Sequence, residues 1–220
     1  MKFALIFILL FSATSFNAFS QDDVEETILT PGETVELISG QVIDFGYSVI
    51  NDMLQLQQIG NNNQITAIQQ LNGNLQFILT ANQEGTGNIG YINQLGNGHE
   101  SLLVQNGNTN VANLWSVGSQ TQNFVQQEGI GNLVNSYIEN YNFQSRTTSS
   151  IQVGDGNKLN LQLPDNNSEN SLIGIMVLQT GAGNSADLFL DHFEAPYLKV
   201  EQTGGAAISI SHSAFNFPTK

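Results

Sequence analysis

The amino-acid sequence predicts an all-β fold, a β-solenoid of about seven strand-turn-strand coils that stack in parallel with a period of about 22 residues. Three observations predict it. A Gln-x-Gly phrase, with one extra residue before the glycine at 70 and Ser in place of Gln at 116, starts at positions 58, 70, 83, 94, 105, 116 and 127. The segments between these turns alternate apolar and polar residues, as half-buried strands do. The turns keep Gln, Gly and Asn at one phase, so identical amides lie above one another in a solenoid and form ladders.

Residues 1–20 have the pattern of a secretory signal peptide. Lys2 is the basic start, residues 3–11 are the apolar run, and residues 18–20 are a small-x-small cleavage site. Nine apolar residues are too few to span a bilayer. We therefore expect a cleaved signal, a chain that is secreted to the extracellular cell surface, and a mature start at Gln21.

Composition excludes several classes of partner. Without Lys2 the mature chain has four basic and 19 acidic residues, a formal net charge of −15. This balance argues against nucleic acid and anionic membranes as partners. The chain has no cysteine, and only 11% of its residues are charged. Asn and Gln fill the polar positions instead, and these amides stack on copies of themselves where like charges would repel.

Residues 21–50 precede the repeat, as an acidic leader with a lead-in strand. Pro31-Gly32 marks a turn, and residues 42–56 read as one or two strands broken at Gly46 and Asn51-Asp52. Two interpretations of the leader stay open, a frayed segment and a handle for secretion machinery. The repeat domain is expected at 51–213, followed by a tail at 214–220.

Within the repeat, each strand has one face for the core. In the segment after Gly183, one face has Asn184, Ala186, Leu188 and Leu190, and the other has Ser185, Asp187 and Phe189. Three more segments follow the same rule, with predicted inward residues Asn157, Leu159, Leu161 and Leu163; Asn110, Ala112, Leu114 and Ser116; and Asn88, Gly90, Ile92 and Gln94.

A β-meander has the same strand lengths, but it gains nothing from in-phase turn residues, so the solenoid is favoured. Gly and Asn tolerate the positive φ of tight turns. The predicted ladder and turn positions are Gln58, Gly60, Gln70, Gly73, Asn74, Gln83, Gly85, Asn88, Gln94, Gly96, Gln105, Gly107, Asn110, Gln127, Gly129, Asn132, Gln152, Gly154, Asn157, Gln179, Gly181, Asn184, Gln202 and Gly204.

The repeated unit resembles a known family. Gln83-Glu-Gly85-Thr-Gly87-Asn88, followed by a short strand that ends in Gln94, is similar to the curlin repeat of curli fibre subunits. The phrases that begin at Gln127, Gln152 and Gln179 are similar too. The resemblance extends over roughly residues 54–210, most of the mature chain.

The resemblance implies a secreted structural protein. Curlin-like proteins leave the cell through an outer-membrane pore with periplasmic assembly factors, and form extracellular amyloid fibres of biofilm matrix that serve cell adhesion. The expected role is therefore fibre subunit or nucleator, with self-association and other curlin-like subunits as partners. Two departures stand out: residues 21–40 are acidic, and the half-units near Glu139, Asp165 and Asp191 have lost the motif.

Catalytic chemistry and cofactors are not predicted. His99 lies in a turn and is expected to be a surface or stacked polar residue, like His192 and His212. Asp155 lacks the repeated nonapeptide of a calcium β-roll. The acids form no cluster that would suit a solenoid hydrolase.

An alternative function is a monomeric secreted β-solenoid adhesin that binds a surface ligand or glycan through one flat face. We expect Trp115, Tyr91, Tyr137 and Phe189 to form an outward aromatic stripe, and three interpretations of it stay open: lateral bundling of fibres, contact with carbohydrate, and ordinary surface packing. Against the alternative, no column of identical outward residues is present.

The last strand, residues 207–212, alternates and is uncharged. Our hypothesis is that this end pairs with the first coil of another copy, because no capping helix follows.

Overall fold

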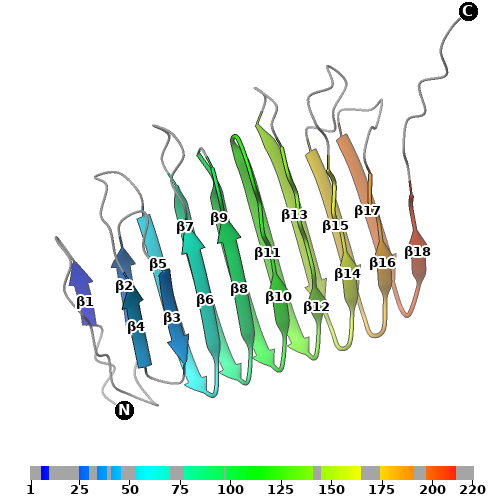
Figure 1. Ribbon diagram of the computed structural model, residues 1–220. Coiled ribbons are helices and arrows are strands. Elements are labelled where there is room, and N and C mark those ends of the chain that lie inside the picture. Colours follow the sequence, from blue (N-terminus) through cyan, green and yellow to red (C-terminus); the bar gives the residue numbers. More distant parts are fainter. Residues whose placement is uncertain are drawn as a thin grey trace, which may run out of the picture.

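The computed structural model shows two β-sheets that lie face to face along the whole array (Figure 1). It describes residues 6–9, 25–29, 34–38, 41–45, 53–69, 77–96, 98–140, 145–164, 174–190 and 197–211. The regular secondary structure of these residues consists of β-strands without helices, so the predicted all-β class is confirmed. Within them, no helix is long and apolar enough to cross a bilayer.

Sheet A has nine strands. Seven of them, from β5 onward, run in parallel and belong to successive coils. In sheet order the strands are β1 (Ile6–Leu9), β2 (Glu25–Leu29), β5 (Met53–Asn61), β7 (Ile78–Thr86), β9 (Glu100–Asn108), β11 (Thr121–Ile130), β13 (Arg146–Val153), β15 (Gly174–Thr180) and β17 (Tyr197–Thr203).

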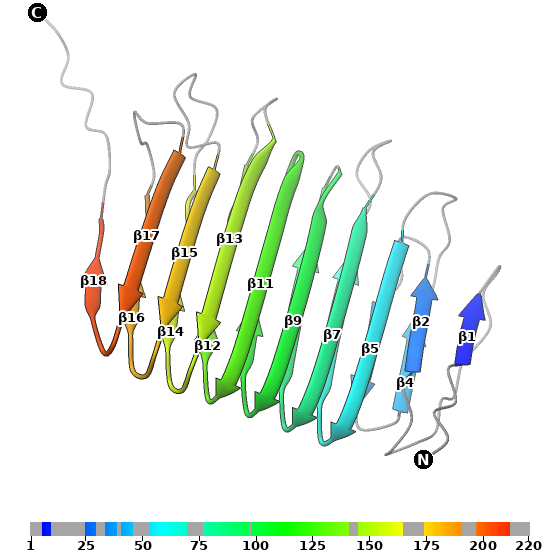
Figure 2. The ribbon, with the colours of Figure 1, turned by 180° about the vertical axis from the view of Figure 1, so that it is seen from behind.

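Sheet B also has nine strands, and those of the repeat are shorter than their partners in sheet A. Figure 2 shows the array from behind, with the tight turns between the two sheets along one border. In chain order the strands are β3 (Thr34–Ile38), β4 (Gln41–Phe45), β6 (Gln64–Gln69), β8 (Ile89–Gln94), β10 (Val111–Asn113), β12 (Leu133–Val134), β14 (Lys158–Asn160), β16 (Ser185–Asp187) and β18 (Ala207–Ser209).

Each coil consists of one strand of sheet A, a tight first turn, one strand of sheet B, and a second turn that leads to the next coil. Coil 1 is β5–β6 and coil 7 is β17–β18. Equivalent residues of adjacent coils are 25, 22, 22, 25, 27 and 23 residues apart. The parallel β-solenoid is therefore confirmed, with six steps between its seven coils that average 24 residues.

The core lies between the sheets and receives alternate residues from both. Leu103 and Ala112 have no exposed surface, and burying a side chain such as leucine stabilises the fold by about 1.5–3 kcal/mol. The four inward faces predicted from alternation are buried. At one of them, a Cβ on Gly90 would lie 2.7 Å from Cδ2 of Leu103, so the larger side chain opposite takes that space.

The N-terminal strands pair differently from the repeat. β2 pairs antiparallel with β5, and β3 pairs antiparallel with β6 and with β4. The leader expected at 21–50 thus contributes strands to both sheets in front of coil 1. β1 pairs parallel with β2 and lies within the predicted signal peptide, whose cleavage stays a prediction. The parallel stacking predicted for the repeat is confirmed from β5 to β18.

Candidate functional site

A column of glutamines connects all seven coils through their side chains. Nε2 of Gln58 donates to Oε1 of Gln83 over 2.9 Å, and the same bond follows at every step with lengths of 2.6–2.9 Å. Every donor lies one coil before its acceptor, so the column has a direction. All seven side chains are buried, at Gln58, Gln83, Gln105, Gln127, Gln152, Gln179 and Gln202.

The second hydrogen of each amide ties the glutamine to the opposite sheet. Nε2 of Gln83 also donates to the carbonyl oxygen of Gln64 over 2.9 Å, and Nε2 of Gln105 donates to that of Ile89 over 3.1 Å. Each internal glutamine therefore bonds its two neighbours in the column and one residue of sheet B. These bonds hold the amide in one orientation. They also fix which residues of adjacent coils, and of the two sheets, lie opposite each other.

A column of asparagines closes the other side of the first turn and runs in the reverse direction. Oδ1 of Asn88 accepts from both the backbone N–H and Nδ2 of Asn110, over 3.0 and 3.1 Å. Nδ2 of Asn88 in turn donates to the carbonyl oxygen of Gly107 over 2.8 Å. The same bonds recur through Asn63, Asn88, Asn110, Asn132, Asn157 and Asn184, and coil 7 has Ala206 at this place.

The first glycine of each turn is required by the stacking. Gly85 has φ +119°, and a Cβ built on it would lie 1.9 Å from the carbonyl oxygen of Gly107 in the next coil. A side chain there has neither space nor an allowed conformation. Gly60, Gly107, Gly129 and Gly154 have the same geometry, and Gly181 and Gly204 continue the column.

The second turns do not repeat this arrangement. Gln94 is buried at the end of β8, where its Oε1 accepts from Oγ of Ser101 over 2.7 Å, and it lies outside the glutamine column. Gly96 forms an isolated bridge with Gly118. Gln70, Gly73 and Asn74 lie outside the described residues. The 11-residue half-unit of the sequence therefore corresponds to two different turns, of which only the first contains the ladders.

Sequence reasoning placed His99 at the surface or in a polar stack, and the structure buries it completely. Its Nδ1 lies 2.7 Å from Oγ1 of Thr121, and its ring lies 5.3 Å from that of Phe77. Burial lowers the pKa of His99 to about 4, against the smaller opposite effect of the backbone at Val117 and Gly96. Nε2 of His99 is buried and has no hydrogen-bond partner, since the backbone groups of Val117 and Gly96 do not meet it with hydrogen-bond geometry.

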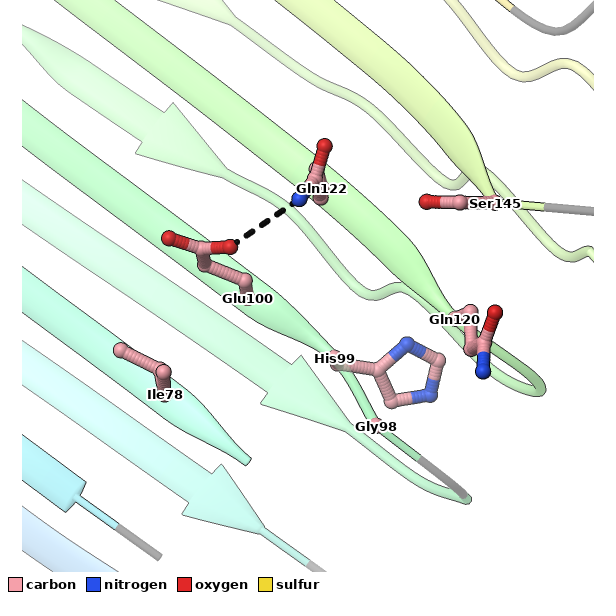
Figure 3. A pocket seen from close by; sticks show the side chains of 7 residues that line it. All are labelled: Ile78, Gly98, His99, Glu100, Gln120, Gln122 and Ser145. Carbon is pink, nitrogen blue, oxygen red and sulfur yellow. Dashed lines mark hydrogen bonds between the residues drawn. The ribbon is translucent and has the colours of Figure 1, made fainter. Parts of the chain in front are cut away.

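A surface hollow of about 390 Å³ lies beside this histidine (Figure 3). Glu100 and Gln122 face it from neighbouring strands and are joined by a bond of 3.2 Å, while the ring of His99 is turned toward Gln120. Its remaining lining residues are Ile78, Gly98 and Ser145. Within the described part of the chain, no three His, Cys, Asp or Glu residues group as metal ligands.

Arg146 is a buried charged side chain that the sequence analysis does not predict. It is 2% exposed and stands in register with Thr121. Its Nη1 donates to the carbonyl oxygens of Leu163 and Ile138 over 2.6 and 2.9 Å. Ile138 has φ +82°, so the irregular second turn directs carbonyls inward and the guanidinium satisfies them. No residue type in the sequence signals such a partner, because the acceptors are backbone atoms.

The predicted aromatic stripe is divided between two columns. Trp115 is 46% exposed, and its ring meets that of Tyr137 edge to face at 4.9 Å. Tyr91 is paired in register with Asn113 and so lies in another column. In the column of Trp115, Tyr137 is bridged to Gln162 of the next coil, and Phe189 follows one coil later. Gln162 therefore separates the Trp115–Tyr137 pair from Phe189.

Comparison of the chain with protein-family models, with curated proteins and with solved structures finds no match. The first turns offer hydrogen-bonding amides, stacked glycines and strand edges, which suit recognition of another strand-turn-strand unit.

Proposed function

We propose that the chain is a secreted structural protein that assembles end to end into curli-like amyloid fibres, as a subunit or as a nucleator. One observation carries the proposal: the glutamine ladder runs in one direction from Gln58 to Gln202, through every coil. A coil that can stack on its neighbour within the chain has the chemistry to stack on an equivalent coil of another copy. Fibres of this kind contribute to extracellular matrix, cell adhesion and biofilm.

The coil 7 end of the ladder supports this assembly. The repeat strands at the end of each sheet order are β17 and β18, and in the described part of the chain nothing pairs with their outer edges. Exposed strand edges are templates for further pairing. Contact between unlike ends of two copies is heterologous, and it continues as a filament when the rotation does not close a ring.

The low charge content of the chain, 11% of its residues, favours close stacking of coils. Low charge in the strands removes like-charge repulsion between stacked coils. The partners we propose are further copies, other curlin-like subunits, an outer-membrane secretion pore and periplasmic assembly factors.

Incubation of the purified chain tests the proposal, with amyloid-dye binding, electron microscopy and fibre diffraction as readouts. Fibres from the chain alone identify a subunit. Acceleration of another curlin-like subunit at low molar ratio identifies a nucleator. A chain that stays monomeric and accelerates no partner contradicts both roles.

A second function has one observation in its favour, the half-exposed Trp115 beside Tyr137. Exposed aromatic rings stack on sugar rings, so this pair suits a glycan-binding adhesin. Binding of the monomer to a glycan array, abolished by Trp115→Ala, would favour that function. Trp115→Ala with unchanged fibre growth separates it from end-to-end assembly.

A further inference from the structure

The N-terminal strands occupy the edge at which a second copy would add, and this inference rests on the proposed function. β2 pairs with residues 54–58 of β5, and β3 pairs with residues 64–68 of β6. On its other side, β5 pairs with β7 over all nine of its residues, including Gly60 and Asn61 of the first turn. The N-terminal strands therefore pair with only part of the edge that a whole coil would cover.

The ends of the glutamine ladder are complementary to each other. Gln83 and each later ladder glutamine use Oε1 to accept the amide of the preceding coil, whereas Oε1 of Gln58 has no such donor within the described residues. At the other end, Nε2 of Gln202 donates to the carbonyl oxygen of Ser185 over 2.8 Å and to that of Ala206 in its own coil over 3.0 Å. The bond to Ala206 stands where the other ladder glutamines bond the next coil, so coil 7 of one copy can exchange that acceptor for Oε1 of Gln58 in coil 1 of the next.

The two ways of pairing coil 1 use the same number of paired residues. The antiparallel arrangement pairs five residues in sheet A and five in sheet B. Coil 7 pairs seven residues in sheet A and three in sheet B with its neighbour, the same total. Stacking of coil 7 on coil 1 also continues the glutamine column from one copy to the next, whereas β2 has Glu25, and no glutamine, in register with Gln58.

We propose that β2 and β3, with β4 beside them, form a displaceable cap on coil 1, and that coil 7 of a second copy replaces this cap during fibre growth. The partner for the edge of β5 and β6 is therefore the edge of β17 and β18. The capped chain is protected from premature addition, and growth requires that the cap open. Addition is directional, because the coil 7 edge has no antiparallel partner among the described strands.

A disulfide lock tests the cap in the whole chain. The chain has no cysteine, so Glu26→Cys with Gln57→Cys places the only two thiols on paired residues of β2 and β5. Glu36→Cys with Thr66→Cys does the same between β3 and β6. Antiparallel partners have Cα separations of about 4.5–5.5 Å, within the range of a disulfide. The reduced form of each variant and the single-cysteine variants are the matched controls.

The expected result is that oxidised chains elongate preformed fibres about tenfold more slowly or worse, because a locked coil 1 cannot receive coil 7 of another copy, and that reductant restores growth. Equal growth of oxidised and reduced chains overturns the cap and leaves the proposed function standing. Absence of fibres from the unsubstituted chain contradicts the proposed function itself.

A second readout uses fluorescently labelled oxidised chains mixed at low ratio with the unsubstituted chain. A locked copy still presents coil 7, so it can stack on coil 1 of a neighbour, but its own coil 1 cannot receive coil 7 of another copy. The label is expected at one end of each fibre only. Label distributed along the fibre length overturns the proposal even if growth rates are uninformative.

Discussion

Nε2 of Gln83 donates a hydrogen bond of 2.6 Å to Oε1 of Gln105, which lies 22 residues later in the chain and one coil further in space. Both side chains are buried, and both carry equivalent bonds to their other neighbours. Because the same bond recurs between each pair of adjacent coils, it aligns equivalent residues of the sequence repeat above one another.

Removal of one ladder glutamine is expected to lower the free energy of unfolding by about 3 kcal/mol, because the loss leaves buried amide groups unpaired at about 1–3 kcal/mol each. Gln105→Leu deprives Gln83 of its acceptor and Gln127 of its donor. Gln126→Leu is the matched control, since Gln126 lies on the outward side of β11, and it should change stability by about 0.5 kcal/mol or less. Urea unfolding measures both, and equal effects would refute the role given to the ladder.

The stacked glycines predict a difference between two kinds of turn glycine. A Cβ on Gly107 would lie 2.1 Å from the carbonyl oxygen of Gly129 at φ +121°, whereas Gly156 at φ +65° has nothing within 4 Å. Gly107→Ala should therefore cost about 3 kcal/mol or more, and Gly156→Ala about 1–2 kcal/mol from its left-handed backbone alone. Thermal unfolding of the two variants distinguishes them. Similar losses would mean that coils do not approach closely at Gly107.

His99 predicts a loss of stability in acid. Its pKa falls from 6.5 to about 4 on folding, so between these values the unfolded chain binds more protons and stability falls as pH falls. The contribution is nil above pH 7 and reaches about 3 kcal/mol at pH 4. Denaturant unfolding of the unsubstituted chain and of His99→Gln from pH 7 to pH 4 isolates it. Parallel stability profiles of the two proteins would show that His99 titrates normally in the folded state.

Arg146→Leu is expected to destabilise the chain by about 2–4 kcal/mol, because the carbonyl groups of Ile138 and Leu163 lose their buried donor. Lys158→Leu, at an exposed position of β14 in the opposite sheet of the same coil, is the matched loss of a cation and should be nearly neutral. Unfolding monitored by the fluorescence of Trp115 reports both. A neutral Arg146→Leu would mean that the second turns of coils 4 and 5 satisfy these two carbonyls in another way.

The first turns could be predicted from sequence because each coil uses the same residue types for the same task. Gln, Gly and Asn recur in phase, and identical amides need identical neighbours. The second turns could not, because His99, Thr121 and Arg146 occupy equivalent corners with three different side chains. His99 contacts the hydroxyl of Thr121, Thr121 accepts from the amide of Asn123, and Arg146 donates to backbone carbonyls. The spacing of residues in the sequence predicts none of these partners.

The pairing of β2 and β3 with coil 1 was also outside the reach of sequence reasoning. Residues 21–40 lack the repeated phrase, so period and phase say nothing of where they dock. Antiparallel pairing of Thr27 with Leu56 joins segments that are distant along the chain, and alternation alone fixes neither partner nor direction.

The most direct test of end-to-end stacking is the mass per unit length of the fibre, measured by scanning transmission electron microscopy. Seven coils in sheet A, each rising about 4.8 Å, predict one chain per about 34 Å when coil 7 stacks directly on coil 1. A value of one chain per about 38 Å would mean that the cap strands stay between copies as an eighth layer. One chain per about 4.8 Å, as in an amyloid whose chains each form a single layer, would contradict the solenoid fibre altogether.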